Sequence, residues 1–380
     1  MAKLETFKTA VIGCGVISEL YLKNICNFFM ITDVVGCSDI IPERSKKRAE
    51  QFNIKQMTNE EIYRDPEIKI VVNLTDPPSH YEVTKAALNA GKHVYCEKMM
   101  AVTLAEGEEL RALARQKKLA YTNAPDAFLG QGMQTARWVI DSGMIGTVVA
   151  VNGICQRGYL LDSSDDQIRM IHRPGGGIPF DMGGYYLHAF IDWFGPIEKV
   201  TGFAKTVNEH RKFLNPHNPL YGDDYTEPSI NTIAASLQFK SGVLGSLTIT
   251  SESLFGGPQK IEVIGTTGTL YAHDPNNFTG PIAVKKRNNP EPLIIPFTHA
   301  FGDQIFRGIG VADMAYAIRN NRKPRADADL GLHAFEIIHK VWESTSTGQT
   351  YTLKHPADRP QAMPPTGLSS QCAEGTLDHC

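Results

Sequence analysis

The sequence lacks the features that mark several classes of protein. Its seven cysteines are odd in number and form no CxxC pair, which argues against a disulfide framework and a structural zinc site. No stretch approaches the ~18 apolar residues of a membrane span, and the N-terminus has no signal-peptide pattern. The histidines show no HxxxH or paired-carboxylate spacing. We therefore expect a cytoplasmic protein without a metal site.

An excess of charge of either sign is also missing. The chain has 38 basic and 41 acidic residues, and its formal net charge is -3. This balance argues against nucleic-acid and membrane-surface partners. With 380 residues the chain is longer than the roughly 250 to 300 residues that one core supports. We expect two domains.

The pattern of apolar residues changes along the chain. Residues 1–124 alternate short β-branched runs with helical stretches, which predicts a parallel, doubly wound α/β sheet of the Rossmann type. Over 125–355 most predicted strands follow one another through short turns, which predicts an α+β domain with a mainly antiparallel sheet. The Pro-rich tail, 356–380, is expected to be flexible or to pack on a neighbour.

A glycine-rich turn, "GCGVIS", follows the first predicted strand. Gly13 permits a tight turn, and Gly15 lets the backbone approach a pyrophosphate. The helix beginning at Val16 and Ile17 would offer unpaired N–H groups to the same ligand. The usual third glycine is Ser18, so a plain glycine turn is the alternative interpretation. The motif predicts a dinucleotide site.

Acidic and basic residues after the second strand bear on the choice of dinucleotide. Asp39 stands where a carboxylate accepts hydrogen bonds from the adenosine ribose and repels a 2'-phosphate, which favours NAD over NADP. The alternative is that Asp39 only caps the helix that begins at Pro42. Arg44 leaves NADP as an alternative cofactor, because a guanidinium can bind the 2'-phosphate of NADP.

Two further loops follow strands of the same predicted sheet. After the third strand, Thr75 and Pro77 would shape the cofactor cleft, and His80 is either a further contact or an ordinary residue of the first helical turn. After the next strand, "CEKMM" projects Glu97 and Lys98 toward the nicotinamide end of the cleft. Alone, a lysine at the end of a strand is usually just solvated.

A second polar motif opens a helix after a Gly-rich loop, in "RPGGGIPFDMGGYYLHAFIDWFG". Helical spacing puts Asp181, Tyr185, His188 and Asp192 on one face. This stripe on an otherwise apolar helix is a candidate catalytic site. The alternative is a capped helix with a hydrogen-bonded internal tyrosine and a surface histidine.

Together the three signatures resemble the Gfo/Idh/MocA family of glucose-fructose oxidoreductases and inositol dehydrogenases, from about residue 7 to about 353. The resemblance implies a Rossmann domain and a second domain whose large open sheet mediates homodimers or homotetramers. It implies that Lys98 contacts the reacting hydroxyl and the nicotinamide. Two positions depart from the family pattern: Met99 replaces a proline, and Tyr185 replaces the catalytic histidine. The proton acceptor is therefore either Tyr185 or His188.

The resemblance implies an NAD(P)-dependent oxidoreductase that acts on a secondary alcohol of a sugar, glycoside or cyclitol, one form being oxidation of a glycoside to its 3-keto derivative. The alternatives are a keto-sugar reductase and a non-catalytic NAD-bound sensor or assembly subunit. Polar residues of the second domain are candidate substrate contacts; they are Asp126, Arg157, Tyr159, His172 and Arg173.

Overall fold

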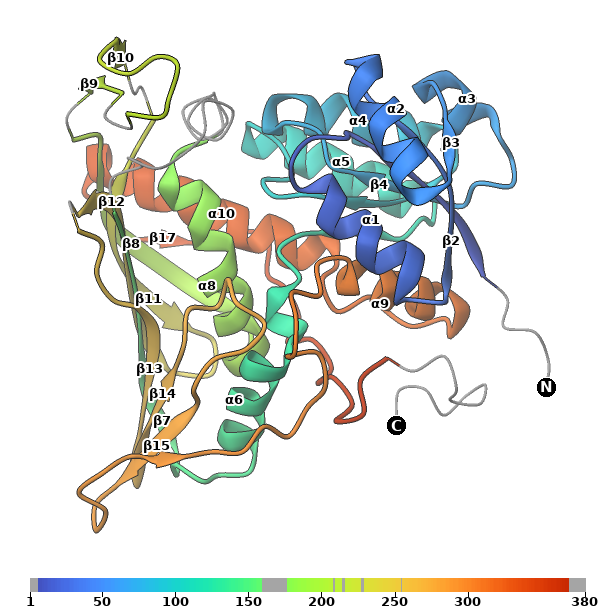
Figure 1. Cartoon of the computed structure of the whole chain (residues 1–380). Coiled ribbons are helices and arrows are strands. Elements are labelled where there is room, and N and C mark those ends of the chain that lie inside the picture. The colour runs from blue at the N-terminus through green and yellow to red at the C-terminus, as the bar shows by residue number, and fades with distance from the viewer. Residues whose placement is uncertain are drawn as a thin grey trace.

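The computed structural model describes residues 6–158, 176–207, 209–213, 216–226, 229–253 and 255–368. The first domain is built on a six-stranded parallel sheet in the order β3-β2-β1-β4-β5-β6. Its strands are β1 (Phe7–Ile12), β2 (Thr32–Ser38), β3 (Lys55–Gln56), β4 (Ile70–Asn73), β5 (His93–Cys96) and β6 (Tyr121–Asn123). The predicted Rossmann architecture is confirmed (Figure 1).

Helices connect successive strands of this sheet and cover it. They are α1 (Ser18–Asn27), α2 (Pro42–Phe52), α3 (Asn59–Arg64), α4 (Pro77–Asn89) and α5 (Leu104–Gln116). Two of them start at capping boxes, in which Thr58 and Thr103 each exchange hydrogen bonds with a glutamate three residues later. The strand order reverses between β1 and β4, and ligands of such sheets bind at the carboxyl ends of the strands at this switch point.

The second domain is built on a nine-stranded sheet in the order β16-β15-β14-β13-β7-β12-β11-β8-β17. Strands β7 and β12 pair in parallel, and the other pairs described in this sheet are antiparallel. The strands are β7 (Val148–Gly158), β8 (Ile197–Lys205), β11 (Thr232–Phe239), β12 (Leu244–Ser253), β13 (Gln259–Gly265), β14 (Gly268–Ala272), β15 (Ala283–Lys286), β16 (Leu293–Ile294) and β17 (Tyr351–Thr352).

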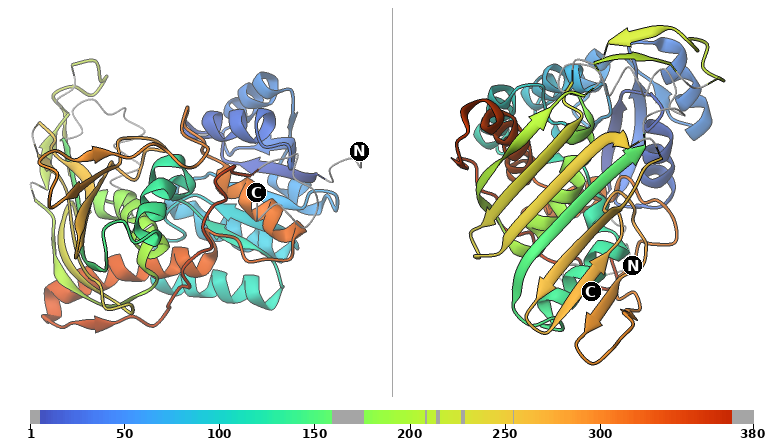
Figure 2. Two further views of the ribbon diagram at one scale, coloured as in Figure 1. Left: turned by 90° about the horizontal axis from the view of Figure 1, so that it is seen from below. Right: turned by 90° about the vertical axis from the view of Figure 1, so that its left-hand side faces the viewer.

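Helices pack on one face of this sheet. They are α6 (Gln131–Asp141), α8 (Ile178–Phe194) and α10 (Ala328–Thr347), with a short 3-10 turn, η1 (Ala127–Leu129), before α6. Strand β11, "TIAASLQF", alternates buried and exposed residues, as expected of a sheet with one covered face. In the described part of the chain no helix covers the opposite face (Figure 2, right). This open, mainly antiparallel sheet was expected.

Part of the segment between β8 and β11 forms a small hairpin. Strands β9 (His210–Lys212) and β10 (Asp224–Thr226) pair in a two-stranded sheet of their own. The hairpin lies beyond one end of the large sheet (Figure 1).

The chain returns to the first domain after the large sheet. Helix α9 (Ile309–Arg319) packs against α1, β5 and β6. The Asn24 side chain donates to the carbonyl oxygens of Ile305 and Arg307, at 2.9 and 2.8 Å. In Figure 1, α9 accordingly lies beside α1. Residues close to 307 are therefore held between the two domains.

The described part of the tail packs on its own chain. Ala357 and Met363 are buried, and the Met363 N–H donates to the Gln134 side chain at 2.9 Å. This stretch therefore contacts α6 of its own chain, residues 369–380 lie outside the described residues, and the expectation of a flexible or neighbour-bound tail stays a prediction. Among the described helices, none combines the length and the apolar character needed to span a membrane.

Candidate active site

The glycine turn between β1 and α1 has two glycines with different roles. Gly13 has φ +99, and a Cβ placed there would lie 2.5 Å from the carbonyl carbon of Leu74, so the close approach of β1 and β4 requires glycine. A Cβ on Gly15 would meet no protein atom within 4 Å. The space beside Gly15 is thus open to a ligand at the N-terminus of α1, where Val16 is 70% exposed.

Ser18 takes the place of the third glycine. It is buried; its hydroxyl donates to the carbonyl oxygen of Gly15 at 2.6 Å and accepts from Nε of Arg48 at 3.1 Å. The side chain therefore braces the turn, and the departure from the usual motif is compatible with the site. Ile17, the N-cap residue of α1, is 37% exposed.

Asp39 holds the turn from the end of β2. Its carboxylate accepts from the backbone N–H of Cys14 at 2.6 Å and from that of Ile41 at 2.8 Å. Asp39 thus lies against the glycine turn and holds the N-cap residue of α2 without capping the helix itself, and its contact with a ribose stays a prediction. Arg44 is an exposed residue of the first turn of α2.

The loop after β4 is fixed by internal hydrogen bonds. The Thr75 hydroxyl donates to the Asn73 side chain at 2.7 Å, and Pro77 begins α4. His80 is buried, and its ring nitrogens face the carbonyl oxygens of Thr75 and Met99. Burial lowers the pKa of His80, although both carbonyl contacts oppose this. His80 therefore joins the loops after β4 and β5 and is not exposed to a ligand.

These residues fit a dinucleotide. The open space beside Gly15, the helix N-terminus and the Asp39 carboxylate follow one another along the carboxyl edge of the parallel sheet. Unpaired N–H groups and the positive end of the α1 dipole favour a pyrophosphate there.

Lys98 and Asp181 meet across the two domains. Lys98 follows β5, Asp181 lies in the first turn of α8, and their side chains form an ion pair in which they are 14% and 22% exposed. The peptide bond between Lys98 and Met99 is cis. Burial lowers the pKa of Lys98, but Asp181, Tyr185 and Glu97 outweigh burial and raise it overall. Burial raises the pKa of Asp181, but Lys98 lowers it overall. Both groups are charged at neutral pH.

Tyr185 lies one turn after Asp181 on α8. Nζ of Lys98 is 5.4 Å from the centre of its ring, and its phenol oxygen accepts a hydrogen bond from Arg307 at 3.0 Å. Burial raises the pKa of Tyr185, although Arg307 and Lys98 act in the opposite direction. An ammonium, a carboxylate and a phenol thus come together, and these groups suit charge stabilisation and proton transfer at a hydroxyl.

Glu97 forms hydrogen bonds that hold the segment next to Lys98. Its carboxylate accepts from the Tyr21 hydroxyl at 2.5 Å and from the Lys98 backbone N–H at 3.1 Å. Tyr21 is also hydrogen-bonded to Tyr95 at 3.0 Å. Both tyrosines are buried. The role of Glu97 is therefore to hold the segment that carries Lys98.

His188 and Asp126 lie in the interior. His188 is 1% exposed, its Nδ1 faces the Pro125 carbonyl oxygen at 3.0 Å, and burial lowers its pKa to about 4. Asp126 pairs with Arg307 at 3.3 Å and accepts from the N–H of Gly308 at 2.8 Å. Burial raises the pKa of Asp126. This differs from the expected substrate contact, because the carboxylate caps the turn before α9.

The other expected substrate contacts lie near the end of β7. Arg157 is half-buried there, its Nε has no hydrogen-bond partner among the described residues, and its charge lowers the pKa of Asp181. Tyr159, His172 and Arg173 lie outside the described residues.

Arg307 is a site residue that the sequence did not reveal. It lies between Phe306 and Gly308 without a periodic pattern, and its side-chain partners are Asp126, Tyr185 and Asn276. A recognisable signal was absent because each partner comes from a distant segment.

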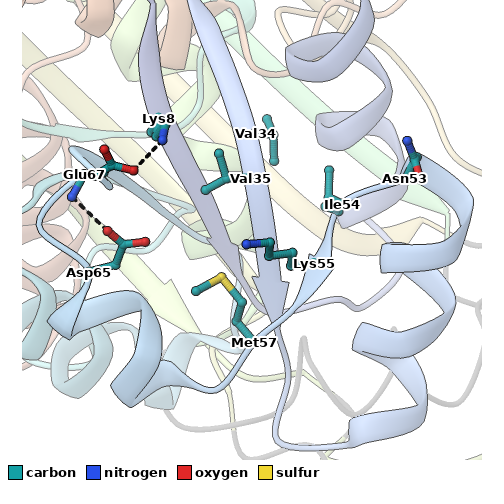
Figure 3. A pocket seen from close by; sticks show the side chains of 9 residues that line it. All are labelled: Lys8, Val34, Val35, Asn53, Ile54, Lys55, Met57, Asp65 and Glu67. Carbon is teal, nitrogen blue, oxygen red and sulfur yellow. Dashed lines mark hydrogen bonds and ion pairs between the residues drawn. The ribbon is translucent and has the colours of Figure 1, made fainter.

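A separate pocket of about 420 Å³ lies beside strands β1, β2 and β3 of the Rossmann sheet (Figure 3). Its walls include Lys8 of β1, Val34 of β2 and Lys55 of β3. None of the residues that line it is a candidate site residue. The pocket is therefore no part of the candidate active site.

Comparison with known families agrees with this arrangement. The family model described as "Oxidoreductase family, NAD-binding Rossmann fold" matches residues 7–124, and the "GFO/IDH/MocA C-terminal domain" matches residues 133–271. The chain belongs to the Gfo/Idh/MocA family. The resemblance inferred from the three signatures is confirmed, and the protein is an oxidoreductase whose first domain binds NAD.

Named relatives of this Gfo/Idh/MocA protein differ in coverage. A scyllo-inositol 2-dehydrogenase (NADP(+)) of Bacillus subtilis is 26% identical over 367 residues, which is 93% of this chain and 98% of the relative. A myo-inositol 2-dehydrogenase of Thermotoga maritima is 22% identical over 72% and 77% of the two chains. An uncharacterized oxidoreductase of Schizosaccharomyces pombe is 34% identical over 52% of this chain, which spans 54% of that relative.

Solved structures of the family share the fold. Levoglucosan dehydrogenase in complex with NADH and L-sorbose has a TM-score of 0.79 at 18% identity, over 92% of this chain and 100% of the other. Aldose-aldose oxidoreductase from Caulobacter crescentus has a TM-score of 0.77 at 20% identity, with the same coverage. These likenesses establish the architecture of both domains.

Proposed function

We propose that the protein transfers hydride between NAD and a secondary alcohol of a sugar, glycoside or cyclitol. The observation that carries this proposal is the meeting of Lys98, Asp181 and Tyr185 at the carboxyl edge of the NAD-binding sheet. The substrate class is supported by the names of the inositol dehydrogenases of Bacillus subtilis and Thermotoga maritima. The same chemistry serves any of these alcohols, because each presents a hydroxyl on a ring carbon.

In this proposal the glycine turn and the α1 N-terminus hold the pyrophosphate of the cofactor, and Asp39 faces the adenosine ribose. A carboxylate beside the 2'-hydroxyl disfavours a phosphate, so NAD is preferred over NADP. Thr75 lines the middle of the cleft and Lys98 the nicotinamide end. When bound, the nicotinamide accepts the hydride that leaves the alcohol carbon.

The chain's own residues handle the oxygen and its proton. The Lys98 ammonium, held by Asp181, donates a hydrogen bond to the substrate oxygen and stabilises its developing negative charge. The Tyr185 phenolate takes the hydroxyl proton as the C–H bond breaks and the carbonyl forms. His188 has no part in this step, because it is buried and faces the Pro125 carbonyl. In the reverse direction the Tyr185 phenol gives its proton to the oxygen.

The raised pKa of Tyr185 favours one direction at neutral pH. A phenol that keeps its proton is ready to act as an acid, which is what reduction of a keto sugar needs. Alcohol oxidation, including oxidation of a glycoside to its 3-keto form, instead needs the phenolate. We therefore propose ketone reduction as the faster direction at neutral pH and alcohol oxidation at alkaline pH.

We also propose that the protein is a homodimer or homotetramer that associates through the open face of the large sheet. This face is wide, and its exposed side chains include Phe203 and Leu244, which are 71% and 57% exposed. Apolar residues in an uncovered sheet favour burial against a partner. The molecular mass in solution, measured by light scattering, tests this.

A substrate screen tests the function. The protein is incubated with NAD and a panel of pyranosides, glycosides and inositols at several pH values, and NADH absorbance is followed; keto sugars with NADH test the reverse. Turnover of a panel member that disappears in Lys98→Met supports the proposal. Tight NAD binding without turnover in either direction would instead favour a sensor or assembly subunit.

A further inference from the structure

Arg307 is a buried arginine next to the proposed proton carrier. It is 6% exposed. Nη2 donates to the Tyr185 hydroxyl at 3.0 Å and to Oδ1 of Asn276 at 2.6 Å, and Nη1 pairs with Asp126 at 3.3 Å. The guanidinium carbon lies 5.0 Å from the centre of the Tyr185 ring. The guanidinium thus contacts both the ring and the oxygen of this tyrosine.

This contact fixes the direction of the phenol proton. A guanidinium only donates hydrogen bonds, so the Tyr185 oxygen must accept from Arg307. The phenol hydrogen then points elsewhere, and among the described residues the structure records no acceptor for it. The Lys98 ammonium, which lies over the ring, also cannot accept. An oxygen atom of a ligand beside Lys98 is the group that this proton suits.

The charges around Tyr185 influence the ionisation of its phenol. Lys98 and Arg307 favour the phenolate, whereas Glu97 and Asp181 oppose it. Asp126 and Asn276 hold Arg307 from its other side, and Asn24 holds its backbone carbonyl at 2.8 Å. The guanidinium cannot move away without leaving the buried Asp126 carboxylate without its countercharge, which is unfavourable.

We propose that Arg307 is the positioning residue of proton transfer, orienting the Tyr185 hydroxyl toward the substrate oxygen and stabilising its phenolate. The inference rests on the proposed function for the transfer itself. It also gives a reason for tyrosine at position 185, since a guanidinium in contact stabilises an anionic phenolate but would oppose a cationic imidazolium.

The test measures ionisation of Tyr185 without turnover. The full chain is labelled with 3-fluorotyrosine, and the Tyr185 signal in the ¹⁹F spectrum is identified by its loss in Tyr185→Phe. The double variant Asp126→Asn/Arg307→Met removes both charges of the buried pair, and Arg307→Lys keeps the charge but loses the fork of donors. The control is Arg325→Met/Asp313→Asn, which removes another buried pair, 2.5 Å apart, outside helix α8.

We expect the titration midpoint of Tyr185 to rise by about 1 pH unit or more in the double variant, because an adjacent cation is lost. Arg307→Lys should shift it less, and the control should leave it unchanged. The pH at which kcat/KM for alcohol oxidation reaches its plateau should move by the same amount.

Two results would overturn the proposal: an unchanged midpoint in the double variant, or a shifted midpoint with an unshifted pH–rate profile. A fall in kcat of equal size at every pH would also overturn the proposal, because the loss of an arginine with a purely structural role would have this effect. If no alcohol or ketone is turned over, the proposed function fails, whereas the ¹⁹F titration still decides whether Arg307 sets the ionisation of Tyr185.

Discussion

The Lys98–Asp181 ion pair permits a quantitative test of the site. Lys98→Met keeps the aliphatic stem and removes the ammonium, leaving Asp181 without its cation. Losing one partner of a fully buried pair costs about 3 to 5 kcal/mol. The two side chains are 14% and 22% exposed, so water compensates in part, and we expect a loss of about 2 to 3 kcal/mol in unfolding free energy. Losing a charged donor at the developing oxyanion should lower kcat about 100- to 1000-fold.

A double-mutant cycle separates the two effects. Lys98→Met, Asp181→Asn and the double variant are compared by denaturant unfolding and by NADH formation. In the double variant no charge is left unpaired, so part of the stability should return relative to Lys98→Met. Turnover should not return, because the ammonium is still absent. NAD affinity, measured by fluorescence titration, should change little, since the glycine turn is untouched.

Lys85→Met is the matched control. It removes a lysine of the same domain from an exposed ion pair with Glu109, 2.7 Å apart with side chains 34% and 50% exposed. Stability and turnover should both stay close to those of the unmodified protein. A Lys98→Met variant with near-normal kcat, or a double variant less stable than both single ones, would refute the reasoning.

Other variants test separate parts of the site. Gly15→Ala should keep its thermal stability but bind NAD more weakly, because its methyl group fills the open space. Gly13→Ala should lose about 2 kcal/mol of unfolding free energy, because its φ is +99 and its methyl group clashes with Leu74. Thermal unfolding with and without NAD distinguishes the two variants. Tyr185→Phe should lower kcat for oxidation about 100-fold or more, as single-turnover kinetics would reveal. Because the phenolate is the base and burial raises the pKa of Tyr185, kcat/KM for oxidation should rise with pH from neutral to alkaline values; a profile flat over this range contradicts that role. Asp39→Ala should weaken NAD binding more than NADP binding in calorimetric titrations, and equal losses would show that its contacts with the glycine turn are its main role.

Much of the fold follows from local patterns. The segments that form the glycine turn, β5 and α8 have a clear pattern of apolar residues and are bounded by glycines or polar residues. The sequence therefore places Lys98 at the end of a strand and Asp181 at the start of a helix. The carboxyl ends of parallel strands share one edge, which places Lys98 beside the glycine turn. The contact of Lys98 with Asp181 of the second domain was implied only by the family resemblance. The parallel pairing of β7 with β12 was not inferred, since the period-2 pattern says which face a residue takes and nothing about the neighbouring strand.

Two residues that were expected in the active site, His188 and Asp126, are instead buried in the interior. His188 has the helical spacing of a site residue, but the 3.6-residue period tolerates a wide stripe, and this side chain falls against Pro125 and Phe128. Asp126 was expected to contact the substrate, whereas its carboxylate pairs with Arg307 in the interior. Contacts between segments this distant in sequence depend on how both domains pack, and no local pattern encodes them.

The return of the chain to α1 has a practical consequence for fragment design. The Gly308 backbone lies against Ile25 and Tyr21 of α1, and the Asn123 N–H donates to the Ala326 carbonyl at 3.0 Å. A fragment cut after residue 124 would lose these partners and leave the apolar surface beneath α9 exposed to water, inviting aggregation. An isolated nucleotide-binding unit would therefore need residues of the region 305–327 joined back by an artificial linker.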